Sequence, residues 1–420
     1  MLAGFEYKKN NLLFSGFSLN EIAKQFGTPA YVYSKHLIKE QIQSYQAAIG
    51  NRNAQVHFAV KSNSNLSILK ILAQLGAGAD IVSGGELFRS LKAGIPANKV
   101  VFSGVGKTDQ EIEFALQSNI MLFSVESKEE LIRISEIAEK LNLKAPVSLR
   151  INPDVDAKTH PYISTGLKEN KFGLPFKEFG AMIDLCLSKS AISLRGFGFH
   201  IGSQLTELAG FEEAAQRALT LSKQFIEKVG SLDFLDVGGG LGIQYENENP
   251  PKPNEYVNRM LSILDLPNTT ILFEPGRSII GSAGLLLTKV LYRKQNESKS
   301  FYICDAAMND LIRPSLYSAY HQIYAVNQTR QESTLHNADL VGPVCETGDF
   351  LARNRALPNF EQGDLIAVAT AGAYGFAMSS NYNSRPRPAE VLIGNNGAVR
   401  LIRRRENYDD LIATELDFIE

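Results

Sequence analysis

The chain has 420 residues, 44% of them hydrophobic and 21% charged, which is ordinary for a globular protein and enough for two domains with separate cores. Its formal net charge of −2 gives no electrostatic reason to expect a nucleic acid or an anionic membrane as a partner. We see no stretch of about 20 apolar residues and no secretory signal. Three widely spaced cysteines (Cys186, Cys304 and Cys345) are typical of a reducing compartment and make no metal-like spacing with the six histidines, so we expect a cytoplasmic protein without a metal site.

Strands and helices alternate regularly along the first two thirds of the chain. The first 30 residues hold short apolar clusters and a helix-like stretch at 19–26, and an amphipathic helix at 34–48 follows. Eight runs rich in β-branched or aromatic residues predict strands at 55–60, 79–82, 99–103, 120–125, 146–151, 194–201, 234–239 and 271–274. Between them, helices are predicted at 65–75, 85–93, 109–117, 128–141, 176–187, 207–229 and 253–263.

This alternation predicts parallel strands covered by helices and buried on both faces. Eight strand–helix units in about 250 residues are what a (β/α)8, TIM-like barrel needs, and we expect it over residues 31–280. A doubly wound open sheet is the structural alternative, and the count of eight favours the barrel.

After residue 280 the pattern changes. Short apolar segments between residues 285 and 402 are separated by turn-rich spacers without matching helices. They predict an all-β domain, a β-sandwich or β-barrel, over residues 281–420. We expect residues 1–30 to join it, because the elements of the barrel begin later.

Unusual residues follow several of the predicted barrel strands. Lys61 follows the first strand, His200 ends the sixth, glycines 238–240 end the seventh and residues 274–277 (EPGR) end the eighth. Barrels of this type place their active sites at the carboxyl ends of the strands, so we expect one site there.

Each of these residues also has a simpler interpretation. A lysine just past a buried strand is usually a surface residue, and a single histidine such as His200 is more often a hydrogen-bonded core residue. The glycine run differs from a dinucleotide-binding loop, because Ile243 replaces the third glycine and the run follows a seventh strand rather than a first.

Taken together, the residues indicate a site for pyridoxal 5′-phosphate. Lys61 at the barrel mouth is a candidate for a Schiff base. The glycine run, Gly276 and Arg277 offer backbone amides and a cation to a phosphate, where barrels often bind one. Glu274 beside that phosphate requires a positive partner, and a pyridinium nitrogen is such a group.

The second predicted domain carries three polar clusters. They hold Asp310, Arg313 and Tyr317 within 305–321, Cys345, Glu346 and Asp349 within 341–352, and Tyr374 in a Gly/Ala-rich loop. For the middle cluster, the simpler interpretation is a turn around Gly348 with Cys345 as a small buried hydrophobic residue. We expect the other two cysteines to lie in the core.

The chain resembles the diaminopimelate decarboxylases, a family of pyridoxal-phosphate enzymes with an alanine-racemase-like barrel. The resemblance covers nearly the whole chain. It rests on AVKSN (59–63), SGGEL (83–87), NPDVDAKTHPYISTG (152–166), NKFG (170–173), GFHIGSQ (198–204), DVGGGLG (236–242), EPGR (274–277), IRPSLY (312–317), CETGD (345–349) and AGAYG (371–375). Related decarboxylases share the first and the eighth-strand motifs, whereas IRPSLY and CETGD are specific to this family.

The resemblance implies a role for each site residue. Lys61 would bind the cofactor as a Schiff base, His200 would stack on its ring, and Glu274 would pair with its pyridinium nitrogen. The phosphate would be surrounded by Ser203, Gly239, Gly276, Arg277 and Tyr374, and Pro275 would also belong to the cofactor site. The distal amino-acid end of the substrate would contact Arg277, Arg313, Tyr317, Glu346 and Tyr374, and Cys345 would donate the proton that replaces the departing carboxylate.

The implied reaction is decarboxylation of meso-2,6-diaminopimelate to L-lysine and carbon dioxide, the last step of lysine biosynthesis. A distal carboxylate suits a guanidinium and a distal ammonium suits a carboxylate, which Arg313 and Glu346 supply. Ornithine and lysine lack that carboxylate and would leave the arginine unpaired at a cost.

Three other functions remain open at this stage. They are a decarboxylase of the same fold acting on ornithine, arginine or carboxynorspermidine, an amino-acid racemase, and a non-catalytic pyridoxal-phosphate carrier. The resemblance also implies a homodimer in which the CETGD loop reaches the barrel of the partner, which places the active site at the subunit interface.

Overall fold

The computed structural model describes residues 1–153, 170–297, 299–395 and 397–419. Most of the motif at 152–166 therefore lies outside the described residues. The chain divides into two compact units, one formed by residues 1–40, 244–248 and 280–420, the other by residues 41–243 and 249–279. The boundaries expected at residues 30 and 280 stay a prediction.

The unit of residues 41–243 and 249–279 is a closed eight-stranded parallel barrel, as predicted. Its strands are β5 (Ala54–Ala59), β6 (Gly78–Ile81), β7 (Val100–Phe102), β8 (Leu122–Val125), β9 (Ala145–Asn152), β11 (Ile192–Gly198), β12 (Phe234–Asp236) and β13 (Thr270–Phe273). Neighbours pair in the order β9, β11, β12, β13, β5, β6, β7, β8, and a β8–β9 pairing closes the ring. The short β10 (Leu174–Pro175) adds to β9. All eight predicted strands are present, most shifted by one or two residues.

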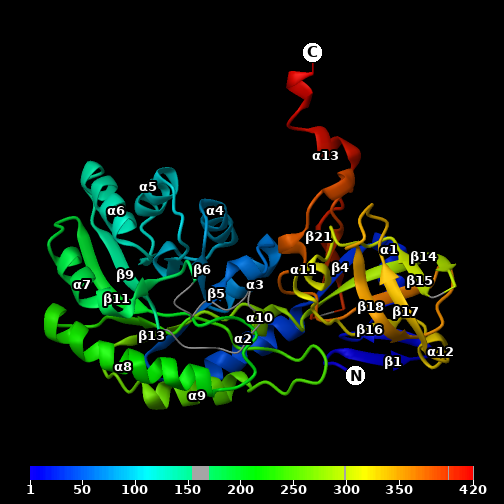
Figure 1. Cartoon of the computed structure of the whole chain (residues 1–420), viewed down its shortest axis with the longest axis horizontal. Coiled ribbons are helices and arrows are strands. Elements are labelled where there is room, and N and C mark those ends of the chain that lie inside the picture. Colours follow the sequence, from blue (N-terminus) through cyan, green and yellow to red (C-terminus); the bar gives the residue numbers. More distant parts are fainter. Residues whose placement is uncertain (154–169, 298, 396, 420) are drawn as a thin grey trace. The chain divides into compact units, whose positions relative to one another are not determined.

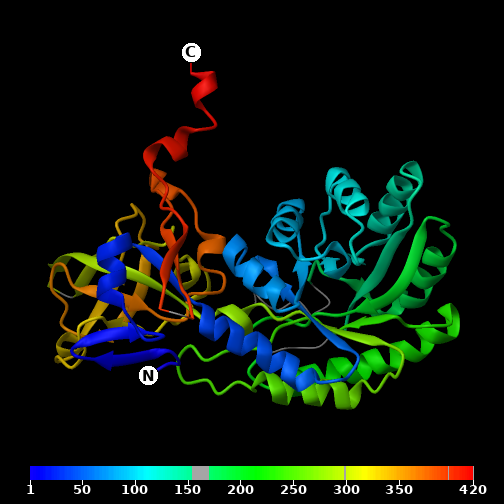
Figure 2. The ribbon, with the colours of Figure 1, turned by 180° about the vertical axis from the view of Figure 1, so that it is seen from behind.

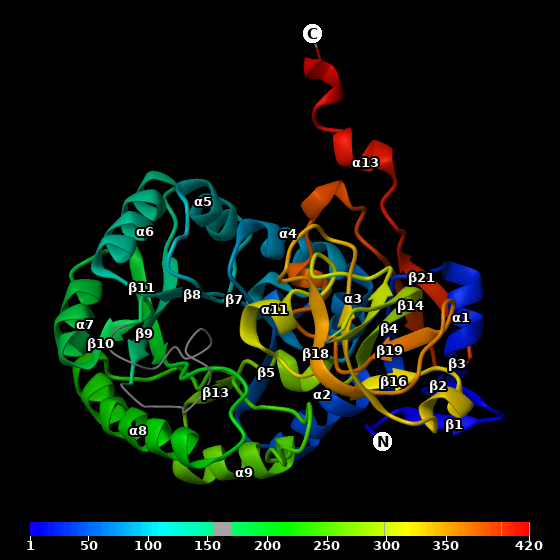
Figure 3. The same ribbon diagram turned by 45° about the vertical axis from the view of Figure 1, so that its right-hand side comes forward.

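Helices cover the outside of the barrel (Figure 3). They are α3 (Leu66–Gln74), α4 (Gly84–Ala93), α5 (Asp109–Gln117), α6 (Lys128–Lys140), α7 (Phe179–Leu187), α8 (Ala209–Val229) and α9 (Pro253–Ile263). Four of them begin at a side-chain N-cap that follows a strand, namely Asn65, Ser83, Thr108 and Ser127. Such a cap stabilises a helix by roughly 1 kcal/mol, and here it fixes where the chain leaves the carboxyl end of a strand.

The other unit is built on a nine-stranded mixed sheet. Its main path is β18 (Phe350–Leu357), β17 (His336–Val341), β15 (Ser300–Cys304), β14 (Gly284–Gln295), β4 (Ala30–Ser34), β20 (Ala389–Ile393) and β21 (Val399–Arg403). β16 (Ile323–Ala325) and β19 (Leu365–Val368) complete it through β14. A separate antiparallel sheet holds β1 (Phe5–Lys8), β2 (Asn11–Phe14) and β3 (Phe17–Ser18), so the N-terminal segment belongs to this unit (Figures 1 and 2).

Three strands of this sheet, β4, β16 and β18, were absent from the sequence prediction. β4 lies between β14 and β20, and every one of its residues is buried. β18 follows the CETGD motif directly and pairs with β17. Short helices also interrupt the unit, α1 (Leu19–Phe26), α11 (Arg313–Tyr317), α12 (Gln328–Gln331) and α13 (Tyr408–Ile412), so its spacers are not purely irregular.

Among the residues that the structure describes, we find no helix long and apolar enough to cross a membrane. The remaining long helix, α2 (Lys35–Ile49), follows β4 directly. Cys186 and Cys304 are buried, as expected, whereas Cys345 is exposed. The interpretation of Cys345 as a small buried hydrophobic residue is therefore wrong.

Candidate active site

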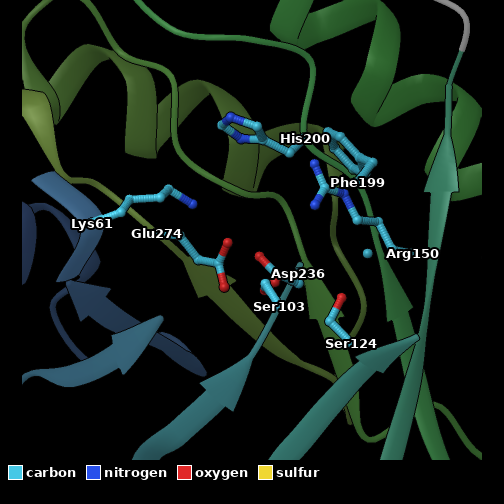
Figure 4. Close-up of a pocket in the computed structure, with 9 residues that line it drawn as sticks. Lys61, Ser103, Ser124, Arg150, Phe199, His200, Asp236 and Glu274 are labelled. Atoms are coloured by element: carbon cyan, nitrogen blue, oxygen red, sulfur yellow. The ribbon is translucent and has the colours of Figure 1, made fainter. Parts of the chain in front are cut away.

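A pocket lies inside the barrel unit at the carboxyl ends of its strands (Figure 4). It is lined by Lys61, Ser103, Ser124, Arg150, Gly198, Phe199, His200, Asp236 and Glu274. Three predicted site residues, Lys61, His200 and Glu274, therefore meet in one place, because each lies at the end of a strand of the same ring.

The Lys61 ammonium forms an ion pair with a buried carboxylate. Its Nζ lies 2.9 Å from Oδ2 of Asp80 in β6, the strand that pairs with β5. Asp80 is fully buried, while about a third of the Lys61 side chain is exposed. The ion pair with Asp80 holds the Lys61 amine at the pocket. The interpretation of Lys61 as a surface residue is therefore wrong.

Glu274 and Asp236 form a buried carboxyl pair. They end the neighbouring strands β13 and β12, and their side chains point toward each other (Figure 4). Burial raises the pKa of Asp236 to about 6, and burial, followed by the charge of Asp236, raises the pKa of Glu274 well above its usual range. One oxygen of Glu274, Oε1, is buried and has no hydrogen-bond partner among the residues that the structure describes. In the hydrogen bond between the two carboxyl groups, Glu274 is the donor and Asp236 is the acceptor.

His200 enters the pocket as a neutral ring. Its Nδ1 accepts a hydrogen bond from the backbone N–H of Gly239 at 3.2 Å. Part of the ring surface faces the pocket, yet the residue is enclosed by protein, and this burial, with the charges of Lys61 and Arg150, lowers its pKa well below the usual value. A neutral imidazole whose Nδ1 is an acceptor offers its face for stacking, rather than a charge.

Arg150 lines the same pocket and is fixed by a buried acid. Its NH1 lies 2.9 Å from Oε1 of Glu126, which also accepts the backbone N–H of Gly104 at 2.9 Å. The other Glu126 oxygen accepts the backbone N–H of Gly173 at 3.1 Å. This places a second cation, besides Lys61, in the lining.

Close backbone packing follows β12 and β13. A Cβ on Gly239 would lie 2.1 Å from the carbonyl oxygen of Glu274, and a Cβ on Gly276 would lie 3.0 Å from Ala59 and Ser62. Only glycine fits at Gly239, so its backbone stays bare.

The turn after β13 is tied down by two further contacts. The carbonyl of Pro275 accepts the N–H of Ala59 at 3.2 Å, which joins the turn to β5. The guanidinium of Arg277 donates to Oγ of Ser203 at 3.1 Å. Arg277 is buried and Ser203 is half-buried. Bare amides, a hydroxyl and a guanidinium form a set of groups suited to an anion.

In the sheet unit, the CETGD motif is a loop anchored by Asp349. The two carboxylate oxygens of this buried residue accept the backbone N–H groups of Met308 and Val344, each at 2.7 Å. The loop thereby presents Cys345 and Glu346 as exposed side chains. The N–H of Cys345 donates to Asn383 at 2.8 Å.

The other predicted residues of the sheet unit lie on α11 and on the loop after β19. Arg313 begins α11 and is buried, and Tyr317 at the end of this helix is half-buried. Tyr374 is half-buried in a loop and has a positive φ of 55°. A tyrosine rarely adopts this conformation, which places a strained residue in the AGAYG motif.

The sequence prediction did not include Asp80, Asp236 and Arg150. Each is a charged residue within an apolar strand, and this pattern could have identified it as a site residue. Strands of a parallel barrel are buried on both faces and should be nearly continuous in apolar residues. A charged residue inside such a run (ADIV, FLDV or SLRI) is therefore out of place unless it points into a site. The prediction used only residues just beyond the strand ends.

The residues of the barrel unit fit pyridoxal phosphate. A protonated ring nitrogen would supply the donor that the buried Oε1 of Glu274 lacks and the positive charge that the carboxyl pair needs. Lys61 supplies the amine, and the bare backbone at Gly239 with Arg277 and Ser203 supplies groups for the phosphate. The described residues contain no group of three or more His, Cys, Asp or Glu side chains that could hold a metal ion.

Comparison with known proteins also indicates a pyridoxal-phosphate protein. Residues 35–281 match the family model described as "Pyridoxal-dependent decarboxylase, pyridoxal binding domain". The chain is 47% identical over 413 residues to the diaminopimelate decarboxylase of Aquifex aeolicus, covering 98% of this chain and 97% of that protein. It is 50% identical to that of Pseudomonas aeruginosa, with 98% of each chain covered. The structure of diaminopimelate decarboxylase from Helicobacter pylori complexed with L-lysine superposes with a TM-score of 0.91 at 46% identity, covering 95% of this chain and 100% of that one.

The barrel and its pocket thus define a pyridoxal-phosphate-dependent decarboxylase. Within that class, the full-length identities show that the chain belongs to the diaminopimelate decarboxylase family.

Proposed function

We propose that this protein converts meso-2,6-diaminopimelate to L-lysine and carbon dioxide, the last step of lysine biosynthesis. The observation that supports it most is the identity of 47–50% with diaminopimelate decarboxylases over 98% of the chain. In the reaction, the bond between one Cα and its carboxylate breaks, carbon dioxide leaves, and a proton takes its place on Cα.

The barrel residues hold the cofactor in this proposal. Lys61 provides the amine that attaches it, and the ion pair with Asp80 keeps that amine at the pocket. His200 would cover one face of the ring, and Ser203, Gly239, Gly276 and Arg277 would surround the phosphate. When bound, pyridoxal phosphate supplies an electron sink for the pair of electrons left on Cα.

Glu274 sets the charge of the ring nitrogen. Its buried carboxylate favours a proton on that nitrogen, because an opposite charge in a low-dielectric site stabilises the ionised form. Asp236 accepts a hydrogen bond from Glu274 in the structure, and its carboxylate adds a negative charge beside Glu274. The pair as a whole therefore strengthens the attraction for a cation.

The distal end of the substrate meets residues of the IRPSLY, CETGD and AGAYG motifs. Arg313 pairs with the distal carboxylate and Glu346 with the distal ammonium, as the charges of the two ends require. The remaining contacts in this proposal come from Tyr317, Tyr374 and Arg277, which touches both phosphate and substrate.

Cys345 donates the proton to Cα. Its side chain is exposed on an anchored loop, a position from which a thiol can reach a substrate and from which a core residue could not. We further expect two copies of the chain to associate, with this loop reaching the barrel of the partner, and we expect the protein to be cytoplasmic.

Release of carbon dioxide from a panel of substrates tests the proposal. The panel contains meso-diaminopimelate, ornithine, arginine and carboxynorspermidine, and the Lys61→Ala variant measures the background. We expect release from diaminopimelate alone. Release from ornithine or arginine without release from diaminopimelate would replace the proposal by a related decarboxylase, and a change in optical rotation of one amino acid without release would indicate a racemase. A chain that binds the cofactor but turns over none of these would be a carrier.

A further inference from the structure

The guanidinium of Arg313 contacts two neutral side chains in the sheet unit, His321 and Tyr245. Its NH1 is 2.9 Å from Nε2 of His321, and its central carbon is 4.6 Å from the centroid of the Tyr245 ring. His321 is fully buried, and the other two residues are nearly so. His321 ends the polar cluster at 305–321 but was given no role there, and Tyr245 lies outside the clusters and motifs of the sequence.

The hydrogen bonds fix the tautomer of His321. Its Nδ1 lies 2.8 Å from the carbonyl oxygen of Ala369. A carbonyl can only accept, so Nδ1 carries the hydrogen, and Nε2 is left as the acceptor for the N–H of Arg313. The imidazole is therefore neutral, because an imidazolium would direct a second N–H group at the guanidinium.

The ring of Tyr245 packs against one face of the Arg313 guanidinium. Its ring meets the His321 ring edge to face, with centroids 5.4 Å apart and planes at 84°. The backbone around Tyr245 is fixed in turn, since Oε2 of Glu248 accepts the N–H groups of Tyr245 at 3.0 Å and of Glu246 at 2.7 Å. His321 thus contacts one edge of the guanidinium and Tyr245 one face, although these two residues lie more than 60 positions apart in the sequence.

These contacts orient the cation without adding a negative charge. A guanidinium binds a carboxylate through two parallel N–H groups only when its plane is correctly directed, and a misdirected plane loses this bidentate geometry. A carboxylate in place of His321 would orient Arg313 equally well but would compete with the anion it is to bind.

We propose that His321 and Tyr245 are positioning residues, which hold Arg313 in the orientation that receives the distal carboxylate of the substrate. This inference rests on the proposed function, since it takes Arg313 as the carboxylate-binding residue. It predicts that the two residues control selectivity for ligands that carry the carboxylate, and have little effect on attachment of the cofactor.

Binding to the holoenzyme tests the inference directly. L-lysine keeps the distal carboxylate, whereas 1,5-diaminopentane lacks it, and both are titrated while the absorbance of the bound cofactor is followed. We expect the wild-type protein to prefer L-lysine. His321→Leu should weaken binding of L-lysine about tenfold, as loss of one charge-assisted hydrogen bond implies, and should leave 1,5-diaminopentane unchanged. KM for diaminopimelate should rise by the same factor.

Matched variants separate positioning from folding. His321→Gln retains an acceptor and a donor, and Tyr245→Phe retains the ring face, so both should keep the wild-type preference. Tyr245→Leu should lose part of it, and this variant serves as the test if His321→Leu does not fold. Val326→Ala truncates a buried residue elsewhere in the same unit and should change stability but not the preference.

Two results would overturn the inference, and they differ from each other. If the wild-type protein decarboxylates diaminopimelate but His321→Leu and Tyr245→Leu keep both the preference and KM, the positioning role fails alone. If the wild-type protein does not act on diaminopimelate, the proposed function fails and the inference falls with it.

Discussion

Asp236 and Glu274 form a hydrogen-bonded pair of buried carboxyl groups at the ends of two adjacent barrel strands. Burial raises the pKa of both acids, and the charge of Asp236 raises the pKa of Glu274 further, so the two cannot both ionise cheaply without a cation. A protonated pyridinium nitrogen would supply the positive charge that lets both acids ionise. The pair is thus the physical feature that ties the barrel to its cofactor.

Replacing Glu274 tests that role. The Glu274→Gln variant keeps the shape of the side chain but removes the charge that favours a protonated ring nitrogen. We expect kcat to fall about a hundredfold, equal to roughly 2.7 kcal/mol, with the cofactor still attached. Steady-state kinetics and the absorbance spectrum measure both. The exposed Glu213→Gln serves as control, and full activity of Glu274→Gln would remove the carboxylate from the mechanism.

The carboxyl pair also predicts how the stability of the cofactor-free protein depends on pH. The pKa of Asp236 is raised to about 6 in the folded state, above the value of about 3.9 expected in the unfolded chain, so the folded state binds this proton more tightly. The corresponding stabilisation is present below about pH 4 and is lost as pH rises through 6, an effect on the order of 2 kcal/mol. The raised pKa of Glu274 acts in the same direction.

The Asp236→Asn variant isolates this contribution. Buried histidines such as His57, whose pKa burial lowers to about 4, oppose the trend, so only the difference between wild type and variant is informative. We expect the melting temperature of the wild-type apoprotein to fall relative to that of the variant between pH 4 and 7. If the melting temperatures of the two proteins changed in parallel with pH, the carboxyl pair would not contribute to the pH dependence of stability.

Lys61 is expected to be the point of attachment. The Lys61→Ala variant lacks the one lysine amine among the described lining residues, and guanidinium and imidazole groups do not form a covalent bond to the cofactor aldehyde. Its visible absorbance should disappear after dialysis, while Lys70→Ala on the exposed face of α3 should keep it. Colour that persists in Lys61→Ala would point to another lysine.

Cys345 is expected to matter for turnover and not for cofactor binding. The Cys345→Ala variant should keep the absorbance of the holoenzyme and lose at least about a hundredfold in kcat, the usual size of a general-acid contribution. The matched control, Cys186→Ala, removes a buried thiol and should lower the unfolding free energy by about 1 kcal/mol at unchanged kcat. Equal turnover in the two variants would contradict the proton-donor role.

Much of the fold follows from the sequence, because the barrel is built from local patterns. Asp109–Gln117 and Pro253–Ile263 are helices with the predicted bounds, since each begins at a clear start signal, Thr108 with Glu111 and Pro253 respectively. β4 was missed because its partners β14 and β20 lie some 250 and 360 residues further along the chain, and five buried residues before a helix carry no periodic signal.

The sequence predicted only those site residues whose location follows from their position just beyond a strand end. Residues beyond the strand ends, such as Lys61 and Glu274, could be assigned to one place because parallel strands end at the same face of a barrel. The contacts of Lys61 with Asp80 and of Arg313 with His321 could not, because they depend on side-chain directions across elements.

The most direct test of the central claim is the product balance with meso-2,6-diaminopimelate. The purified holoenzyme is given a known amount of substrate, and carbon dioxide and L-lysine are both measured at completion. We predict one of each per molecule of substrate consumed, with no carbon dioxide released from ornithine under the same conditions. Carbon dioxide from ornithine, with diaminopimelate left intact, would contradict it.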